Sequence, residues 1–325
     1  MGAFWKNKRV LVTGGAGFIG SHVVEKLVAA EARVTVPIRT KESQTTYLQA
    51  VREKIDIRIA DLMHIDKCQE VVEGQDIVMN LAARIGGIEY NIRHPGSIFR
   101  DNMQVFMNVL EAARLCEVER VLVTSSACVY PRFCTIPTPE TEGMVDRPEP
   151  TNEGYGWAKR MEEFLAQAYG QEYGMPLAIA RPYNAYGPRD NFDPGSSHVI
   201  PALIKRIYDG EDPLTVWGDG SQSRSFLYVD DAARGLLEVA EKYAANDAVN
   251  LGAEEEISIR DLVALLVQLS GKQIHVQFDS SKPAGQPRRK CDTRKAIEKV
   301  GFTPQVTLTQ GLTQTVAWYR TEFLS

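Results

Sequence analysis

The sequence predicts an α/β fold with a doubly wound parallel sheet and a smaller C-terminal α/β lobe. Two observations lead to this prediction. Short apolar runs, each long enough for one buried strand, alternate with helical stretches through residues 1–181, which is typical of a parallel sheet. The composition then changes, because proline, glycine and asparagine cluster over residues 182–195, as is common in loops.

The first apolar run ends in a glycine-rich turn. Residues 10–13, Val-Leu-Val-Thr, have the composition of a strand, and residues 21–30 predict a helix. Glycines between a strand and a helix permit a tight turn and let backbone N–H groups approach a pyrophosphate. This placement favours a dinucleotide-binding Rossmann domain over a purely structural turn. The residues expected to contact the cofactor here are Gly14, Gly17, Phe18, Ile19 and Gly20.

The second predicted strand, residues 33–39, bears on the choice of cofactor. Domains of this kind that prefer NAD place an acidic residue near the end of this strand, on the ribose hydroxyls. Here Ile38, Arg39, Thr40 and Lys41 stand there instead. Because a guanidinium suits a 2′-phosphate, Arg39 favours NADP. The alternative is that Arg39 only stacks beside the adenine and that the cofactor is NAD.

The remaining elements complete the sheet and outline the lobe. Further strands, separated by helical stretches such as residues 102–115, are expected at residues 57–62, 76–83 and 120–126. The C-terminal part predicts a strand at residues 223–229 and helices at residues 198–210, 230–244 and 258–270. We therefore expect a Rossmann domain over residues 1–181, to which residues 225–251 return, and a substrate-binding lobe over residues 182–325.

Composition and charge narrow the class of protein. Of 325 residues, 44% are hydrophobic and 24% are charged, as in ordinary globular domains. The net charge of −5 leaves no basic footprint for nucleic acid, and no apolar run reaches membrane-spanning length. The N-terminus lacks a signal-peptide pattern, and the five cysteines show neither disulfide nor zinc spacing. We expect a cytoplasmic protein that holds no metal and binds neither nucleic acid nor membranes.

A Ser…Tyr-x-x-x-Lys pattern supplies candidate catalytic residues. Tyr155 and Lys159 are four residues apart, so their side chains point the same way on a helix, and Ser126 precedes them at the end of a predicted strand. A nearby ammonium lowers the pKa of a phenol. Such a phenol can pass a proton to or from a carbonyl or alcohol while a nicotinamide carries the hydride. Tyr-x-x-x-Lys also occurs in ordinary amphipathic helices, but beside the glycine turn it indicates an oxidoreductase.

With the glycine turn, Ser126, Tyr155 and Lys159 in this order, the chain resembles the extended short-chain dehydrogenase/reductase family over nearly its whole length. Members of this family mostly modify nucleotide sugars. The runs Arg181-Pro-Tyr-Asn-Ala-Tyr-Gly-Pro188 and Arg224-Ser-Phe-Leu-Tyr-Val-Asp-Asp231 are similar to family motifs as well. The resemblance implies further contacts to the cofactor, adenine included, from Asp61, Leu62, Leu81, Ala82 and Ala83.

Two segments resemble the GDP-L-fucose synthases of this family. The dehydratases of the same family carry an Asp-Glu pair directly after the catalytic Ser or Thr. Ala127 and Cys128 occupy these two positions here. Elimination of water would therefore lack its acid and its base. The run Ser125-Ser-Ala-Cys-Val-Tyr-Pro131 is instead similar to the segment whose cysteine is an acid/base in fucose synthases and GDP-mannose 3,5-epimerases. His198 lies in a segment similar to the one that holds the partner histidine. Taken singly, Cys128 could be a core residue and His198 a helix-start residue; together they predict an acid/base pair.

The resemblance also implies a set of substrate-binding residues. Residues 279–289 are similar to a Ser-Lys-Pro-x-Gly-x-Pro-Arg stretch of fucose synthases, and basic side chains there could clamp a diphosphate. The alternative is a solvated basic loop. The expected substrate-binding residues are Gly87, Asn184, Arg206, Arg224, Lys282 and Arg289.

These features together predict a nucleotide-sugar epimerase/reductase. It would epimerise a GDP-4-keto-6-deoxyhexose at C3 and C5 and then reduce C4 with NADPH. A redox-neutral epimerase with tightly bound NAD is an alternative, because Gly15-Ala-Gly-Phe-Ile-Gly20 is similar to the turn of NAD-dependent epimerases. A non-catalytic dinucleotide sensor is a third, although such proteins commonly lose the Tyr or Lys. The resemblance implies a homodimer through helices at residues 102–115 and 155–173, unless their apolar positions face only the core.

Overall fold

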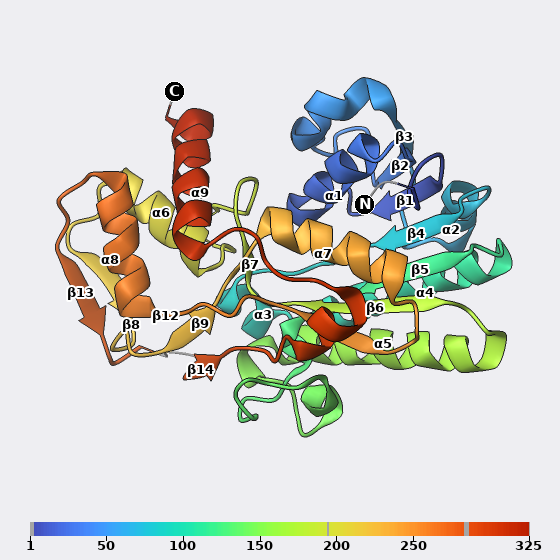
Figure 1. The fold of residues 1–325 in the computed structure, drawn as a ribbon. Coiled ribbons are helices and arrows are strands. Elements are labelled where there is room, and N and C mark those ends of the chain that lie inside the picture. Colours follow the sequence, from blue (N-terminus) through green and yellow to red (C-terminus); the bar gives the residue numbers. More distant parts are fainter. Residues whose placement is uncertain (1–2, 194, 283–285, 325) are drawn as a thin grey trace.

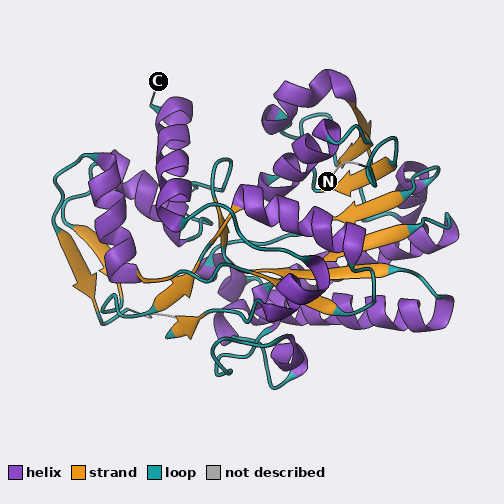
Figure 2. Cartoon of the chain, viewed as in Figure 1, coloured by secondary structure: helices purple, strands orange, loops and turns teal. Residues whose placement is uncertain are grey.

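The computed structural model describes residues 3–193, 195–282 and 286–324. A seven-stranded sheet runs through the larger part of the molecule in the order β11-β6-β5-β4-β1-β2-β3 (Figures 1 and 2). All neighbouring strands in it are parallel, which confirms the predicted doubly wound sheet. The strands are β1 (Arg9–Thr13), β2 (Arg33–Ile38), β3 (Ile55–Ile59), β4 (Ile77–Asn80), β5 (Arg120–Thr124), β6 (Leu177–Pro182) and β11 (Ala248–Leu251).

Apolar residues on both faces of the strands build two cores. Successive side chains of a strand point to opposite faces. Along β1, Val10 and Val12 therefore pack into one core and Leu11 into the other. The same alternation in β5 sends Leu122 to the first core and Val121 to the second. Burial on both faces explains why these strands are almost continuous apolar runs.

Helices cover both faces of the sheet (Figure 1). On one face, α1 (Phe18–Ala29) and α7 (Val229–Lys242) pack beside each other. On the other lie α2 (Ile65–Val72), α4 (Pro95–Leu115) and α5 (Glu153–Tyr173). None of the helices in the described part of the chain combines the length and the apolar character that crossing a bilayer requires.

The C-terminal lobe has a hydrophobic core of its own, to which buried residues of α6, α8 and α9 contribute. These helices are α6 (Val199–Asp209), α8 (Ile259–Ser270) and α9 (Leu308–Phe323). Its strands are β8 (Leu214–Trp217), β9 (Ser223–Ser225), β12 (Glu256–Ser258), β13 (Val276–Asp279) and β14 (Arg288–Arg289). β13 pairs with β8, and β9 lies between β12 and β14. The predicted smaller α/β lobe is therefore confirmed.

The chain passes between the sheet and the lobe more than once. After β6 it forms β7 (Ala185–Tyr186) and enters the lobe. It leaves the lobe through β10 (Leu227–Tyr228), which pairs with β7, and α7 then leads to β11 at the sheet edge. Because these crossings lie side by side, residues from both parts meet at the carboxyl ends of the strands.

Several predicted elements have somewhat different bounds in the structure, and two differ most. Residues 223–229 form two short strands, β9 and β10, because the chain changes sheet at Phe226, whose side chain is buried in the lobe core. The helix predicted from residue 102 begins at Pro95, since proline fits the first turn of a helix. The shorter elements are the 3₁₀ segments η1 (Thr46–Lys54), η2 (Ala127–Val129), η3 (Glu140–Met144) and η4 (Pro150–Asn152), the helix α3 (Ile88–Arg93) and the π-helical turn η5 (Ala296–Val300).

Candidate active site

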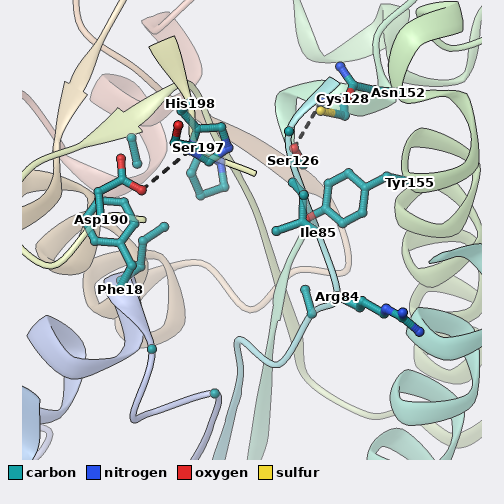
Figure 3. Close-up of a pocket in the computed structure, with 18 of the residues that line it drawn as sticks. Phe18, Arg84, Ile85, Ser126, Cys128, Asn152, Tyr155, Asp190, Ser197 and His198 are labelled. Carbon is teal, nitrogen blue, oxygen red and sulfur yellow. Dashed lines mark hydrogen bonds and ion pairs between the residues drawn. The ribbon is translucent and has the colours of Figure 1, made fainter. Parts of the chain in front are cut away.

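A cavity of about 1690 Å³ lies between the carboxyl ends of the strands and the lobe (Figure 3). This edge of an open parallel sheet is where α/β proteins bind ligands. The predicted cofactor-binding, catalytic and substrate-binding residues all line the cavity except Lys282. The side chain of Lys282 is exposed after β13, so the structure does not bring it into the site; the neighbouring residues 283–285 lie outside the described part of the chain.

The glycine turn joins β1 to α1 at one end of the cavity. Gly14 has φ +67°, a left-handed conformation that favours glycine, and a Cβ there would lie 2.9 Å from the backbone of Leu81 and Ala82. A Cβ on Gly20 would collide with the carbonyl oxygen of Gly14. Thr13 holds the facing segment in place, because its hydroxyl accepts hydrogen bonds from the Leu81 and Ala82 N–H groups at 3.1 Å.

The N-terminus of α1 opens into this end of the cavity. Gly17 is the capping residue, and no side chain caps the helix. Phe18 and Ile19 line the cavity at the first turn. Free backbone N–H groups and the helix dipole favour a phosphate, so the turn fits the pyrophosphate of a dinucleotide.

The end of β2 lies near the same part of the cavity. Arg39 follows the strand, is exposed and lines the cavity together with Ser43 and Gln44. Asp61 also lines it, and its carboxylate accepts a hydrogen bond from the Met63 N–H at 3.1 Å. A guanidinium at the end of β2 can contact a 2′-phosphate.

Ser126, Tyr155 and Lys159 lie on one wall of the cavity. Helix α5 presents Tyr155 and Lys159 on one face, with the Lys159 Nζ 5.6 Å from the centre of the Tyr155 ring. Figure 3 shows Ser126 beside Tyr155. The Ser126 hydroxyl accepts a hydrogen bond from the Cys128 N–H at 3.1 Å, which fixes the serine at the start of η2. The structure therefore brings the three predicted residues together.

The pKa of Tyr155 reflects burial as well as the predicted effect of Lys159. The sequence predicts that Lys159 lowers the pKa of this phenol. Burial instead raises the pKa of Tyr155 to about 12, and the ammonium of Lys159 offsets only part of the rise. The charges of Cys128 and Glu162 raise it further. Lys159 lowers the pKa as predicted, but the net shift is upward because the phenol is only 6% exposed and burial disfavours the phenolate.

Lys159 is engaged in a buried ion pair. Its Nζ lies 2.8 Å from Glu162 Oε2 and donates to the carbonyl oxygen of Thr124 at 3.0 Å. The side chains of Lys159 and Glu162 are 3% and 2% exposed. Glu162 was not predicted from the sequence, although an acid three residues after Lys159 on a predicted helix is a usable signal.

Cys128 faces the cavity from the same wall and has a cationic neighbour. Arg289, on β14, donates from Nη2 to the Cys128 sulfur at 3.8 Å. Burial lowers the pKa of Arg289, but the charges of Cys128 and Tyr183 outweigh it, so the guanidinium stays protonated. The guanidinium of Arg289 therefore faces the sulfur of Cys128 at the edge of the cavity.

His198 lies on the opposite wall, at the start of α6 (Figure 3). Its Nδ1 is 3.6 Å from Asp190 Oδ1, and its side chain is 51% exposed to the cavity. Burial lowers the pKa of His198, but the nearby Asp190 carboxylate outweighs it and raises that pKa above its usual value. Asp190 itself is buried. An imidazolium oriented in this way is suited to act as an acid.

Two arginines stand side by side near Cys128. Arg224 on β9 pairs in register with Arg289 on β14. Burial, and then the charge of Arg289, lower the pKa of Arg224 to about 10. Two adjacent guanidiniums that repel each other in this way gain from a bound anion.

The other predicted substrate-binding residues line the cavity with partners of their own. Asn184 donates from its side chain to the Ser225 carbonyl at 2.8 Å. Arg206 forms a bidentate pair with Glu211, at 2.5 and 2.6 Å, so its guanidinium is already engaged. Gly87 lies where a Cβ would be 3.2 Å from the backbone of Ser196.

Asp190 and Glu149 also line the cavity, but the sequence did not indicate them. Both are buried, and each has a carboxylate oxygen without a hydrogen-bond partner among the described residues. Asp190 lies eight residues before His198 in a loop, and a loop has no helix or strand periodicity from which their proximity could be predicted. Glu149 precedes η4 and accepts a hydrogen bond from the Thr151 N–H at 3.0 Å. Only the folded chain places these acids at the site.

Comparison with known proteins gives the same family and fold. Residues 10–252 match the model of the NAD dependent epimerase/dehydratase family. The chain is 34% identical to GDP-L-fucose synthase 1 of Arabidopsis thaliana, over 97% of this chain and 94% of that protein. It is 31% identical to GDP-L-fucose synthase of Escherichia coli K12, over 96% of each. The structure of UDP-glucose 4-epimerase from Thermotoga maritima with UDP-glucose superposes with a TM-score of 0.87, at 28% identity, over 96% of this chain and 99% of that one.

Proposed function

Because the chain belongs to the NAD dependent epimerase/dehydratase family, we propose that it epimerises a GDP-4-keto-6-deoxyhexose at C3 and C5 and then reduces it at C4. One observation carries the proposal. Cys128 beside Arg289 and His198 beside Asp190 face one cavity from opposite walls. A base and an acid on opposite faces of a sugar ring are what inversion at a carbon needs. The GDP-L-fucose synthases to which the chain is similar support the choice of sugar.

The epimerisation follows from the chemistry of a C4 ketone, which acidifies the C–H bonds at C3 and C5. The Cys128 thiolate removes a proton from carbon, and the C–H electron pair moves into an enolate. The enolate oxygen accepts hydrogen bonds from Tyr155 and Ser126. His198 returns a proton to the opposite face of the carbon. Proton exchange with solvent then restores the thiolate and the imidazolium for the second carbon.

Reduction at C4 uses the wall that carries Tyr155. When bound, the nicotinamide dinucleotide supplies the hydride. Tyr155 donates its phenolic proton to the C4 oxygen, and Lys159 stabilises the phenolate that is left. A nearby Ser126 hydroxyl orients the C4 oxygen toward the phenol. The loop that follows β4 borders the cavity beside this wall, and its Gly87 lies next to the backbone of Ser196.

The two ligands are assigned to the two ends of the cavity. The glycine turn and the open N-terminus of α1 hold the pyrophosphate of the dinucleotide, and Arg39 at the end of β2 supports NADP over NAD. Arg224 and Arg289 hold the diphosphate of the sugar nucleotide. Further contacts to the sugar nucleotide come from Asn184, Arg206 and Gly87.

The proposal also includes a cytoplasmic homodimer. Helices α4 and α5 pack against each other and expose large apolar side chains at Met107, Leu115 and Phe164. Covering these side chains with a second copy would remove their apolar surface from water. Light scattering of the purified protein would give twice the monomer mass; a monomer would refute this part.

The test is an isotope experiment in deuterated water. GDP-4-keto-6-deoxymannose is incubated with the protein, with and without NADPH, and followed by mass spectrometry and nicotinamide absorbance. Deuterium at two carbons together with NADPH oxidation is the expected result. Exchange without oxidation would mean an epimerase alone. If neither occurs, the substrate assignment is wrong.

A redox-neutral epimerase with tightly bound NAD is the second candidate. The similarity to UDP-glucose 4-epimerase and the run Gly15-Ala-Gly-Phe-Ile-Gly20 favour it. Such a protein would be purified with NAD at one per chain and would consume no NADPH. Mass spectrometry of the nucleotide released by acid would separate the two candidates.

A further inference from the structure

Glu162 is an acidic residue inside the wall that carries Tyr155 and Lys159. Its side chain is 2% exposed, and its carboxylate lies 2.8 Å from the Lys159 ammonium. Tyr155, Lys159 and Glu162 follow one another along α5 at spacings of four and three residues, so they share one face of the helix. The phenol, the ammonium and the carboxylate therefore form one electrostatic unit.

The two directions of redox chemistry place opposite demands on Tyr155. Reduction of a ketone needs a phenol that can donate a proton to the oxygen. Oxidation of an alcohol needs a phenolate that can accept one. An unbalanced Lys159 ammonium would favour the phenolate, whereas a carboxylate against that ammonium cancels part of its effect.

We propose that Glu162 is a positioning residue that balances the charge of Lys159, adds to the effect of burial in keeping Tyr155 in its phenol form and so biases the site toward reduction. This inference rests on the roles proposed above for Tyr155 and Lys159. It concerns whether the site favours reduction or oxidation, which Tyr155 and Lys159 do not determine by themselves.

The other charged groups around this wall do not replace Glu162. Glu163 follows it on α5, but its carboxylate pairs with the Arg181 guanidinium at 2.7 and 2.8 Å. Cys128 lies on the cavity side and raises the pKa of Tyr155 in its thiolate form. Among the described residues, Lys159 is the cation that Glu162 contacts.

The pKa shifts agree with this geometry. Burial is the largest cause that raises the pKa of Tyr155, and Glu162 adds to the rise while Lys159 opposes it. Burial also raises the pKa of Glu162 to about 6, so it is ionised at neutral pH. Burial lowers the pKa of Lys159, but the charge of Glu162 helps to raise it above the usual value. Lys159 and Glu162 are therefore both charged at neutral pH.

The first measurement is the titration of Tyr155 by NMR. The protein is labelled at the tyrosine Cζ carbon, and the Tyr155 resonance is assigned by its loss in Tyr155→Phe. In Glu162→Gln, which keeps the size and a hydrogen-bond acceptor, we expect a midpoint about one pH unit lower than in the wild type. The ratio of phenolate to phenol would be about tenfold higher at any pH below both midpoints. An unchanged or higher midpoint would overturn the proposal.

Two further variants separate charge from packing. Glu162→Asp keeps the negative charge and should keep the wild-type midpoint, whereas a shift equal to that of Glu162→Gln would mean that only packing matters. Glu172→Gln, on the exposed end of the same helix, should leave the midpoint unchanged. If Glu162→Gln does not fold, Glu162→Leu removes the same charge from the same buried position and should lower the Tyr155 midpoint in the same direction; an unchanged midpoint there would also overturn the proposal.

The second measurement uses the reaction. Glu162→Gln should extend oxidation of the C4 alcohol to a pH about one unit lower and lower the pH above which reduction declines. The NMR titration needs no sugar nucleotide. A midpoint shift without turnover of the GDP-sugar would therefore refute the proposed substrate and support the role of Glu162. Turnover without a midpoint shift would support the proposed substrate and refute the role of Glu162.

Discussion

The two ends of the cavity are built from different parts of the chain. The end near α1 is made of backbone: Gly14 is left-handed, and Gly20 packs against the Gly14 carbonyl. The end near α6 and β14 is made of charged side chains, such as His198 with Asp190 and Arg289 with Cys128. At the first end, adding a single Cβ atom to a glycine causes a steric clash. At the second end, replacing a charged side chain with one of the same size changes its charge or proton transfer and leaves the packing intact.

The wall that carries Tyr155 lies between these two ends and serves both ligands. Its helix, α5, is joined to β6 by the buried Glu163–Arg181 ion pair and to β5 by the hydrogen bond from Lys159 to the Thr124 carbonyl. A change there should therefore affect the reaction most, a change at the acid/base pair next, and a change in the glycine turn should act on cofactor binding alone.

Tyr155→Phe should cause the largest loss. It removes the proton donor for C4, so kcat/KM for reduction should fall on the order of 10³-fold. Steady-state rates of NADPH oxidation measure the effect. Tyr173→Phe, at the exposed end of the same helix, is the control and should match the wild type. A loss of less than tenfold in Tyr155→Phe would mean that another group protonates C4.

Cys128→Ser and His198→Asn should each slow epimerisation on the order of 10²-fold, because each removes one proton carrier. Deuterium incorporation from deuterated water measures this step directly. NADPH binding should not change, since both residues lie at the sugar end. Cys116→Ser, at the end of α4, serves as the matched cysteine control. If exchange survives in both site variants, the acid/base pair is assigned to the wrong residues.

Gly20→Ala should weaken cofactor binding and leave the acid/base pair intact. The new Cβ would meet the Gly14 carbonyl, and the turn must open at a cost of about 2 kcal/mol, or about 30-fold in the Kd for NADPH. Fluorescence titration of NADPH gives the Kd. Gly96→Ala has open space around its Cβ and should bind as the wild type does. Equal Kd values for the two variants would argue against a cofactor in this turn.

The two ends of the cavity also differ in how far they could be predicted, because one depends on local sequence patterns and the other on contacts between distant segments. The glycine turn and the Tyr155–Lys159 spacing are local patterns, and the structure places them together at the carboxyl ends of the strands. Glu162 was equally local and could have been predicted from its spacing. In contrast, Arg289 and Cys128 are 161 residues apart in the sequence, and the segments that carry them meet through the Thr138–Cys291 bridge and the hydrogen bond from Gln286 to the Pro131 carbonyl.

Burial accounts for the net pKa shift of Tyr155, which the sequence did not predict. A Tyr-x-x-x-Lys motif indicates that two side chains meet, but it does not indicate how much water they retain. The fold buries the Tyr155 phenol, and this raises its pKa more than Lys159 lowers it. Lys282 shows the converse, since a resemblance over residues 279–289 could not predict which basic side chain points away from the cavity.

Asp190→Asn should have the smallest effect and appear as a change in pH dependence. Asp190 raises the pKa of His198, so the imidazolium that donates a proton persists to higher pH, and exchange declines as pH rises through that pKa. In Asp190→Asn this decline should begin about one pH unit lower, while the rate at acidic pH stays close to that of the wild type. Asp209→Asn, on the exposed side of α6, should not move the profile. A uniform loss of rate at every pH would mean that Asp190 only holds the loop in place.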